Sequence, residues 1–400
     1  MSGGVDSSVA AALLKYGDAR LPAGRQGFDV VGIHLKMWAP RENQEAGSMD
    51  QGLESVCRQQ YQDRIDAVAV AAKLDIPFQT WDLSEEYRRV VVEYMIRGYA
   101  AGRTPNPDVM CNREIKFGLF LKRALETGAD YIATGHYARK REVKNKKSKS
   151  KSYALAQARD TNKDQAYFLW TLTQEQLRHC LFPIGEYQKS EVREMARKFG
   201  LPTAEKPDSQ GVCFIGEFNM REFLKNYIPE RPGRVETAAG AVVGEHSGVE
   251  FYTIGQRHGI GLGGGIPYYV ANKDLAANTI TVAEGPYDGN LFRKELIATD
   301  TSWVSGQAPH FPLRCQARIR YRQPLQRCTV QADENDQSDK IDLTFLPSEA
   351  IHRAQRSTNL IIRFTEPQRA VTPGQSIVFY RGEPFDPAQG KEMLGGGIIA

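Results

Sequence analysis

The sequence lacks any long apolar segment and any strong excess of one charge. None of its apolar runs reaches the roughly 18 residues that a membrane helix needs. Its start is Gly-rich and does not have the basic and apolar pattern of a secretory signal. The net charge of +4 is too small to indicate nucleic-acid binding by itself. We therefore expect a cytoplasmic protein without a membrane partner, in which local clusters of charge decide what it binds.

The six cysteines include no CxxC pair and no zinc-ligand spacing, so we expect no metal site built from them. In a large cytosolic chain the default state of cysteine is a reduced thiol. Small residues surround Cys213 in the segment 206–216, which suits a thiol that a partner must reach. Four cysteines lack such a setting and are interpreted as structural: Cys57, Cys180, Cys315 and Cys328.

A loop rich in glycine and serine precedes the first predicted helix. Residues 2–8 have the sequence SGGVDSS and lead into an Ala/Leu run with good helix propensity. Free N–H groups at such a helix start bind anions, and glycine lets the backbone approach a phosphate. The serine hydroxyls add donors, and Asp6 is a candidate ligand for a Mg²⁺ that bridges phosphate oxygens. The ordinary alternative is a helix capped by Asp6 or Ser7.

The loop is not a Walker A motif, because GxxxxGK[ST] is absent. SGGVDSS resembles the PP-loop of ATP pyrophosphatases, which split ATP between the α and β phosphates and activate a carbonyl oxygen as its adenylate. In that family a hydrophobic strand precedes the loop. Here the loop follows Met1 directly, so we expect the sequence as given to lack that strand.

Strand and helix patterns alternate in the first third, which predicts a doubly wound α/β domain with a parallel sheet. The segments are a strand at 30–35, an amphipathic helix at 61–74 and strands at 76–82 and 131–137. Ligands of such domains bind at the carboxyl ends of the strands, where the last of these carries Gly135 and His136. His136 is a candidate ligand contact, or else a strand-end histidine bonded to the backbone.

A helix is predicted to begin at Asn106, which is a good N-cap, followed by Pro107 at the first helical position. It should run to Leu125. Cys111 lies in the first turn, where the helix dipole favours the thiolate, and Asp108 lies on the same side and can exchange a proton. The alternative for Cys111 is a buried, unreactive thiol.

Basic and polar residues dominate the next segments. Residues 139–151 contain eight basic residues and one acidic residue, and a strand at 153–155 follows, which indicates a solvated hairpin tip with a weak contribution to RNA binding. Residues 160–169 start polar and lead into a helix, so this segment is a candidate ligand contact.

The remainder is predicted to be β-rich, with a small β domain at 217–290 and a β-barrel at 291–400. The predicted strands are 251–254, 280–282, 360–362 and 376–380. Arg318, Arg320 and Arg322 alternate, so a strand would place all three on one face. Because no acidic residue occurs from 313 to 327, we favour RNA contact over a solvated sheet edge.

Taken together, the motifs are similar to those of the tRNA-specific 2-thiouridylase family (MnmA/TrmU). After SGGVDSS come NPDVMCNREIKFG, ATGHYAR, NKDQAYFL, SQGVCFIG, ARIRYRQ and FTEPQRAVTPGQSIVFYRGE, in this order over nearly the whole chain. The chain departs from the family at an insertion near Leu21, at the basic run and at 385–391. The resemblance implies a PP-loop domain at 1–216, a central β domain at 217–290 and a tRNA-binding barrel at 291–400.

The resemblance also implies a role for each matching residue. ATP would be bound by Ser2, Gly3, Gly4, Val5, Asp6, Ser7, Ser8, Leu35 and Gly135. The target base would meet Asn106, Pro107 and Asp108, with Cys111 as the nucleophile and Cys213 as the persulfide carrier. The tRNA would contact His136, Lys163, Asp164, Gln165, Arg320, Tyr321 and Gln375.

The implied reaction uses Mg–ATP to adenylate the C2 carbonyl of a wobble uridine, and a persulfide from a donor such as a cysteine desulfurase or sulfur-relay protein replaces the oxygen. Cys111 either frees the sulfur by forming a disulfide with Cys213, or resolves the product after direct persulfide attack. Asp108 would manage protons. Two other hypotheses are a different PP-loop enzyme, such as an amidotransferase or 4-thiouridine synthase, and a non-catalytic RNA-binding remnant.

Overall fold

The computed structural model describes residues 1–18, 27–38, 51–143, 151–208, 219–263, 265–333, 359–382 and 390–400, and only the helical backbone of 51–57. Several expectations lie outside these residues: the insertion near Leu21, the Cys57 side chain, most of the basic run, Cys213, and most of 385–391. Within the described residues, no helix has the length and apolar character needed to span a membrane.

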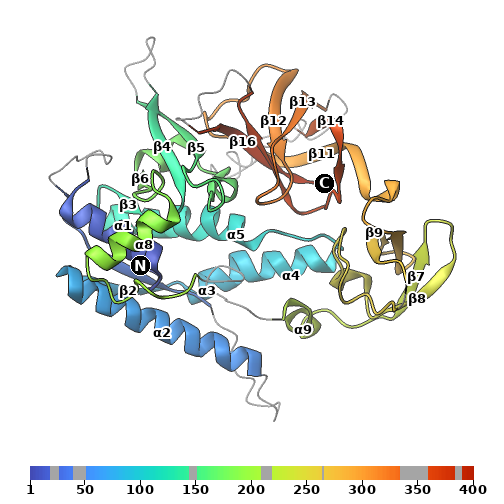
Figure 1. The fold of residues 1–400 in the computed structure, drawn as a ribbon, viewed down its shortest axis with the longest axis horizontal. Coiled ribbons are helices and arrows are strands. Elements are labelled where there is room, and N and C mark those ends of the chain that lie inside the picture. The colour runs from blue at the N-terminus through green and yellow to red at the C-terminus, as the bar shows by residue number, and fades with distance from the viewer. Residues whose placement is uncertain are drawn as a thin grey trace, which may run out of the picture.

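The first part of the chain combines helices with parallel strand pairs (Figure 1). Strands β1 (Gly32–Lys36) and β2 (Phe78–Asp82) pair in parallel, and so do β3 (Ile132–Ala133) and β6 (Cys180–Leu181). Helix α1 (Val5–Tyr16) packs against both α2 (Gln51–Leu74) and α8 (Lys189–Lys198). Buried Ala and Leu side chains of α1 face these neighbours. The predicted α/β class is confirmed, although β3 is shorter than the strand predicted at 131–137.

A long helical region follows β2. It comprises α3 (Ser84–Tyr87), the π-helix η2 (Arg88–Val92), α4 (Glu93–Ala100), α5 (Pro107–Met110), the π-helix η3 (Cys111–Phe120) and α6 (Leu121–Glu126). As predicted, Asn106 caps the helix start, because its side-chain oxygen accepts a hydrogen bond of 3.2 Å from Val109 N. The predicted helix through Leu125 is also confirmed, with a wider π-helical middle.

Strands β4 (Ala138–Val143) and β5 (Ser152–Gln157) pair antiparallel, and the residues between them, 144–150, lie outside the described residues. The second of these strands then joins the C-terminal sheet, because Leu155 of β5 pairs with Met393 of β16 (Glu392–Ile399), and β4 is left at the edge. Next to this seam, Tyr167 Oη donates to Ser376 O at 2.8 Å and Trp170 Nε1 donates to Ser376 Oγ at 3.0 Å. One sheet therefore connects the first part of the chain with its last strand.

The C-terminal strands close into a six-stranded barrel, because β11 pairs with both β14 and β16. The barrel consists of β16 and five further strands: β11 (Phe292–Trp303), β12 (Leu313–Arg318), β13 (Gln326–Ala332), β14 (Leu360–Arg369) and β15 (Ser376–Tyr380). A separate four-stranded sheet precedes the barrel: β7 (Gly233–Thr237), β8 (Val242–His246), β9 (Tyr268–Asp274) and β10 (Thr279–Glu284). Short helices connect these parts: η4 (Ala166–Leu169), α7 (Gln174–Arg178), α9 (Met220–Lys225), η5 (Val249–Phe251) and η6 (Gly289–Leu291).

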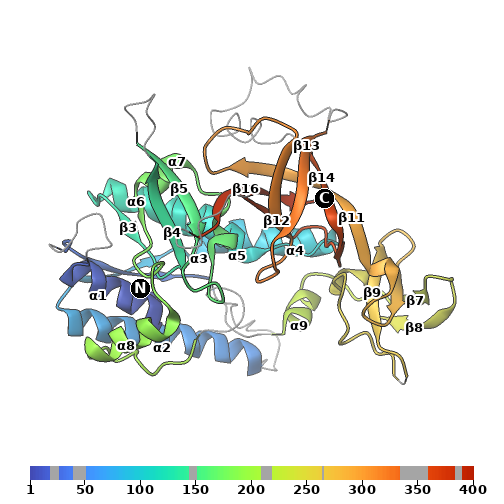
Figure 2. The ribbon, with the colours of Figure 1, turned by 45° about the horizontal axis from the view of Figure 1, so that its top comes forward.

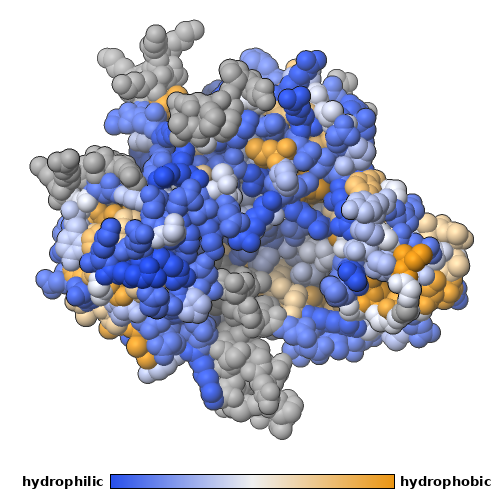
Figure 3. All heavy atoms as spheres, viewed as in Figure 1, coloured by the Kyte–Doolittle hydropathy of each residue, from blue (hydrophilic) through white to orange (hydrophobic). Residues whose placement is uncertain are grey.

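The three parts enclose a hollow face of the molecule. In the turned view of Figure 2 the barrel lies above the long helical region, and the four-stranded sheet lies at the end away from α1. Figure 3 shows a largely hydrophilic face with a hollow between these parts, and apolar side chains gather over the four-stranded sheet. Val242 of β8 and Ile266, which precedes β9, are exposed apolar residues.

Two predicted strands are wrong. Residues 251–254 do not form a strand. They follow η5 in a turn that is bounded by Gly248 and Gly255, both at positive φ, and Phe251 and Tyr252 are buried there. Strand β12 ends at Arg318, and Arg322 lies at φ +63° in a turn, so the three arginines do not share one strand face. The capped-helix alternative for residues 2–8 is also wrong, because the N-cap is Gly4 and no side chain caps α1.

Candidate functional site

The glycine-serine loop is held in a narrow turn at the start of α1. Ser7 Oγ and Ser8 Oγ donate to Gly4 O at 3.1 and 2.8 Å, and Ser2 N donates to Ser7 Oγ at 3.1 Å. Gly3 has a φ of +71°, and a Cβ there would lie 2.1 Å from Asp63 O of α2. Only glycine fits this position, so the loop backbone lies directly against α2.

The end of β3 touches the same loop, as expected for the carboxyl edge of a parallel sheet. A Cβ on Gly135 would lie 2.7 Å from Ser7 N and 2.8 Å from Asp6 C. Leu35 is buried in β1 on the core side. In the same strand, His34 Nδ1 donates to Met1 O at 3.1 Å. Burial lowers the pKa of the Met1 amine to about 5. The structure thus places Gly135 against residues 6–7, and Leu35 within the neighbouring strand.

A network of ion pairs surrounds Asp6. Its carboxylate accepts from Lys189 Nζ at 2.7 and 2.9 Å and from Tyr137 Oη at 2.8 Å. Lys189 Nζ also lies 2.8 Å from Asp208, and Asp208 in turn pairs with Lys163 at 2.5 Å and Arg193 at 2.9 Å. Burial alone raises the pKa of Asp208, but the hydrogen bonds from Lys163 and Lys189 outweigh it and the pKa falls to about 2. The network joins the loop at residues 2–8 to Lys163.

Sequence reasoning missed Tyr137, Lys189, Arg193 and Asp208 as parts of this network. Tyr137 belongs to the motif ATGHYAR and Asp208 directly precedes SQGVCFIG, so the sequence offered a signal for both residues. Lys189 and Arg193 lie in a polar amphipathic helix that is typical of a solvated surface, so nothing local indicated them. Only the packing of α8 on α1 brings them to the loop.

Cys111 begins the π-helical segment, one turn after the partly exposed Asp108. The Cys111 side chain is fully buried in the main core cluster. Its neighbour Asn112 donates from Nδ2 to Phe168 O at 3.1 Å, which fixes this helix against η4. Cys213 lies outside the described residues, so the expected pairing of the two thiols stays a prediction.

Three residues expected to contact tRNA have buried or internally bonded side chains. His136 lies against Phe117 and Phe182, and its pKa is well below the usual value because of burial and then the charge of Lys116. Asp164 is buried and accepts from Ala158 N and Ala166 N at 3.0 and 3.2 Å. Gln165 Oε1 accepts from Tyr137 N at 3.0 Å. Of these three side chains, Gln165 bonds directly to Tyr137, whose hydroxyl contacts Asp6.

Arg320 and Gln375 lie where the three parts of the chain meet. Arg320 donates to Ile254 O, Ala370 O and Thr372 Oγ1 at 2.9–3.0 Å, and Gln375 Nε2 donates to Thr104 O at 2.8 Å. Both side chains therefore hold the barrel against the neighbouring parts. Tyr321 packs on Phe168 with ring centroids 4.7 Å apart.

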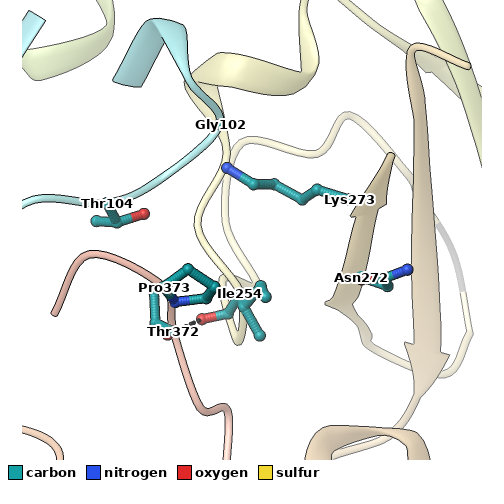
Figure 4. A pocket seen from close by; sticks show the side chains of 7 residues that line it. All are labelled: Gly102, Thr104, Ile254, Asn272, Lys273, Thr372 and Pro373. Atoms are coloured by element: carbon teal, nitrogen blue, oxygen red, sulfur yellow. Dashed lines mark hydrogen bonds between the residues drawn. The ribbon is translucent and has the colours of Figure 1, made fainter. Parts of the chain in front are cut away.

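A cavity of about 90 Å³ opens at this junction. Its lining comes from all three parts: Gly102, Thr104, Ile254, Asn272, Lys273, Thr372 and Pro373. Figure 4 shows the Lys273 side chain reaching across the cavity toward Gly102. Lys273 Nζ donates to Tyr252 O at 2.6 Å, and burial lowers its pKa to about 8.

The described residues hold no group of three or more His, Cys, Asp or Glu side chains placed to bind a metal ion. The single carboxylate of Asp6, at a loop suited to phosphate, still fits Mg²⁺, which usually takes one or two protein carboxylates together with substrate phosphates.

The fold and the loop define a class of nucleotide-binding protein, and comparison with known families agrees. Residues 1–217 match the family model described as a tRNA methyl transferase HUP domain. Residues 221–284 match the family model described as a tRNA methyl transferase PRC-barrel domain. Residues 293–351 and 346–399 match an aminomethyltransferase β-barrel domain.

Curated relatives identify the family more closely. The chain is 44% identical over its full length to the "tRNA-specific 2-thiouridylase MnmA 2" of Geobacillus kaustophilus, of which 93% is covered. It is 43% identical over its full length to the MnmA proteins of Nitrosomonas eutropha and Bacillus anthracis, of which 96% and 93% are covered. The chain belongs to the tRNA-specific 2-thiouridylase family, which confirms the resemblance drawn from its motifs.

Proposed function

We propose that this protein is a cytoplasmic, ATP-dependent tRNA 2-thiouridylase that converts a wobble uridine to 2-thiouridine. The observation that carries the proposal is the similarity of the whole chain to relatives that are named for this activity. The family models are named for methyl transfer and the curated relatives for thiolation. Thiolation is the activity that agrees with the loop at residues 2–8, which resembles an ATP-binding PP-loop, and with the two cysteine motifs.

In this proposal residues 1–216 bind ATP and carry the chemistry, 217–290 form a connecting domain, and 291–400 form the tRNA-binding barrel. The loop at residues 2–8 binds the phosphates through backbone N–H groups at the positive end of α1. Leu35 and Gly135 border the nucleoside. Asp6 supplies one carboxylate to Mg²⁺, which neutralises phosphate charge when it is bound.

The sulfur chemistry uses two thiols. ATP adenylates the C2 oxygen of a uridine held by Asn106, Pro107 and Asp108, and pyrophosphate leaves. Cys213 carries a persulfide; the Cys111 thiolate attacks its inner sulfur, forming a Cys111–Cys213 disulfide and releasing HS⁻. The sulfide attacks C2, AMP departs with the oxygen, and an external dithiol reduces the disulfide. In the alternative order the persulfide attacks C2 and Cys111 resolves the intermediate. Asp108 accepts or delivers the proton.

The expected tRNA contacts divide by how their side chains are bonded. Lys163 and Tyr321 have partly exposed side chains and are proposed to touch the nucleic acid directly. Gln165, Arg320 and Gln375 are also partly exposed, but their side chains bond to the protein backbone. His136, Asp164, Gln165, Arg320 and Gln375 act within the protein in this structure, so we propose that they position the turns and backbone that face the tRNA. A persulfide donor protein is the second partner.

The test is a thiolation assay with unmodified tRNA, Mg–ATP and a persulfide donor, followed by mass analysis of the nucleosides. Wild-type protein should produce 2-thiouridine, and Cys111→Ser and Cys213→Ser should produce none while adenylation continues. Full product yield from Cys213→Ser would refute the assigned sulfur carrier. Production of 4-thiouridine would favour another PP-loop enzyme, and the absence of ATP–pyrophosphate exchange would favour an RNA-binding remnant.

A further inference from the structure

Lys189 occupies a position that the proposed reaction has not yet used. It is the first residue of α8, and its backbone N–H donates to Asp160 at 2.9 Å, so the base of the side chain is fixed. The side chain is only 13% exposed and its ammonium contacts both carboxylate oxygens of Asp6. Because Asp6 follows the glycines of the loop by two residues, this ammonium lies at the edge of the phosphate-type site.

We propose that Lys189 binds the phosphate chain of ATP, an inference that rests on the proposed function. With Mg²⁺ present, the Asp6 carboxylate would hold the metal, and the Lys189 ammonium would then be released from Asp6 to bind phosphate oxygens. Lysine suits this role because it is a compact charge on a flexible stem that can exchange one oxyanion for another.

The partners of Lys189 make the exchange inexpensive in free energy. Breaking a partly buried ion pair is costly mainly when it leaves a charge without a partner. Among the described residues, Asp208 would keep Lys163 and Arg193, at 2.5 and 2.9 Å. Asp6 would keep the hydroxyl of Tyr137, at 2.8 Å, in addition to the metal. The departure of Lys189 therefore leaves neither carboxylate unpaired.

The other cations of the network do not have this geometry. In the described residues, the hydrogen-bonding partners of the Asp6 carboxylate are Tyr137 and Lys189. The carboxylate that Lys163 and Arg193 contact is Asp208. Arg193 also donates to Ala204 O and Lys206 O at 3.0 and 3.1 Å. Among the described residues of this network, Lys189 is thus the cation that the fold delivers to the loop. Lys198, at the exposed end of the same helix, provides a matched control.

The test measures equilibrium binding of ATP and of inorganic pyrophosphate by calorimetry, without catalysis. Lys189→Met should weaken both ligands by about tenfold to a hundredfold, the loss expected for one charged contact to phosphate. Adenosine affinity should not change. Lys198→Met makes the same substitution at the exposed end of α8, and it should leave ATP affinity within about twofold of wild type. Equal affinity of wild type and Lys189→Met for ATP would overturn the proposal.

A double-mutant cycle separates phosphate binding from a role in holding Asp6. If Lys189 only positions Asp6, adding Lys189→Met to an Asp6→Asn background changes nothing further. If Lys189 binds phosphate, the second substitution costs at least another tenfold in pyrophosphate affinity, with EDTA present as well as with Mg²⁺. Wild-type protein that fails to bind ATP would refute the proposed function itself. Wild-type binding with a silent second substitution would refute only the role of Lys189.

Discussion

Gly135 is the point where the end of β3 touches the loop at residues 2–8, and an added methyl group there is the smallest change that pushes the loop. A Cβ at Gly135 lies 2.7 Å from Ser7 N, and ordinary contact begins at 3.4 Å, so the loop must move by about 0.7 Å. Such a shift stretches a phosphate hydrogen bond from about 2.9 Å to about 3.6 Å, beyond useful range. Losing one charged hydrogen bond costs about 1.5–3 kcal/mol, or roughly 10- to 100-fold in Kd.

Gly135→Ala is therefore expected to weaken ATP binding roughly 10- to 100-fold, with a loss of about 1–3 kcal/mol in unfolding free energy from overpacking. Calorimetric titration with ATP and urea unfolding measure the two quantities. Gly289→Ala is the matched control, because a Cβ at Gly289 meets no heavy atom within 4 Å. A folded Gly135→Ala protein that binds ATP like wild type would refute the placement of the phosphates on this loop.

Three further predictions concern the barrel and its junction. Arg320→Ala should lower the unfolding free energy by about 1.5–3 kcal/mol, because three acceptors lose one charged donor. It should also weaken tRNA binding at several salt concentrations without changing ATP affinity. An unchanged Tm would contradict the stability prediction. The pKa of Lys273 falls from 10.5 to about 8 on folding, so between these pH values the unfolded chain binds more protons than the folded protein. The stability of wild type relative to Lys273→Met should therefore rise from pH 8 to 10.5, by up to about 3 kcal/mol. A stability difference that does not change with pH in urea unfolding would contradict this prediction. Cys328→Ala removes a thiol buried 3.6 Å from the Cys315 sulfur, so it should cost about 1–2 kcal/mol in stability yet keep full thiolation, and loss of product by mass analysis would show that Cys328 takes part in the reaction.

Local signals in the sequence predicted local structure well. The strand at 376–380 was predicted with its observed bounds, because five consecutive apolar or small residues are buried there. Asn106 and Pro107 predicted a helix start that the structure confirms, since capping depends on residues next to one another. The placement of Gly135 at the loop followed from the general rule that strand ends of a parallel sheet share one edge.

Contacts between distant segments were not predictable in the same way. The alternating arginines resembled a strand face, but Arg318 is buried 3.7 Å from Asp164, and the chain turns after it. The pairing of β5 with β16 joins residues more than two hundred positions apart, and no sequence pattern in either strand indicates its partner. The Lys189 contact with Asp6 likewise arises from helix packing, and no local sequence pattern encodes it.

Strand β16 pairs with β15, β11 and β5, so a single segment at the end of the chain completes two structures at once. During synthesis the barrel stays an open sheet, and the hairpin edge at β5 stays unpaired, until β16 leaves the ribosome. A nonsense mutation shortly before Glu392 would therefore expose three strand edges together, and we expect such a product to aggregate instead of surviving as a separate ATP-binding domain.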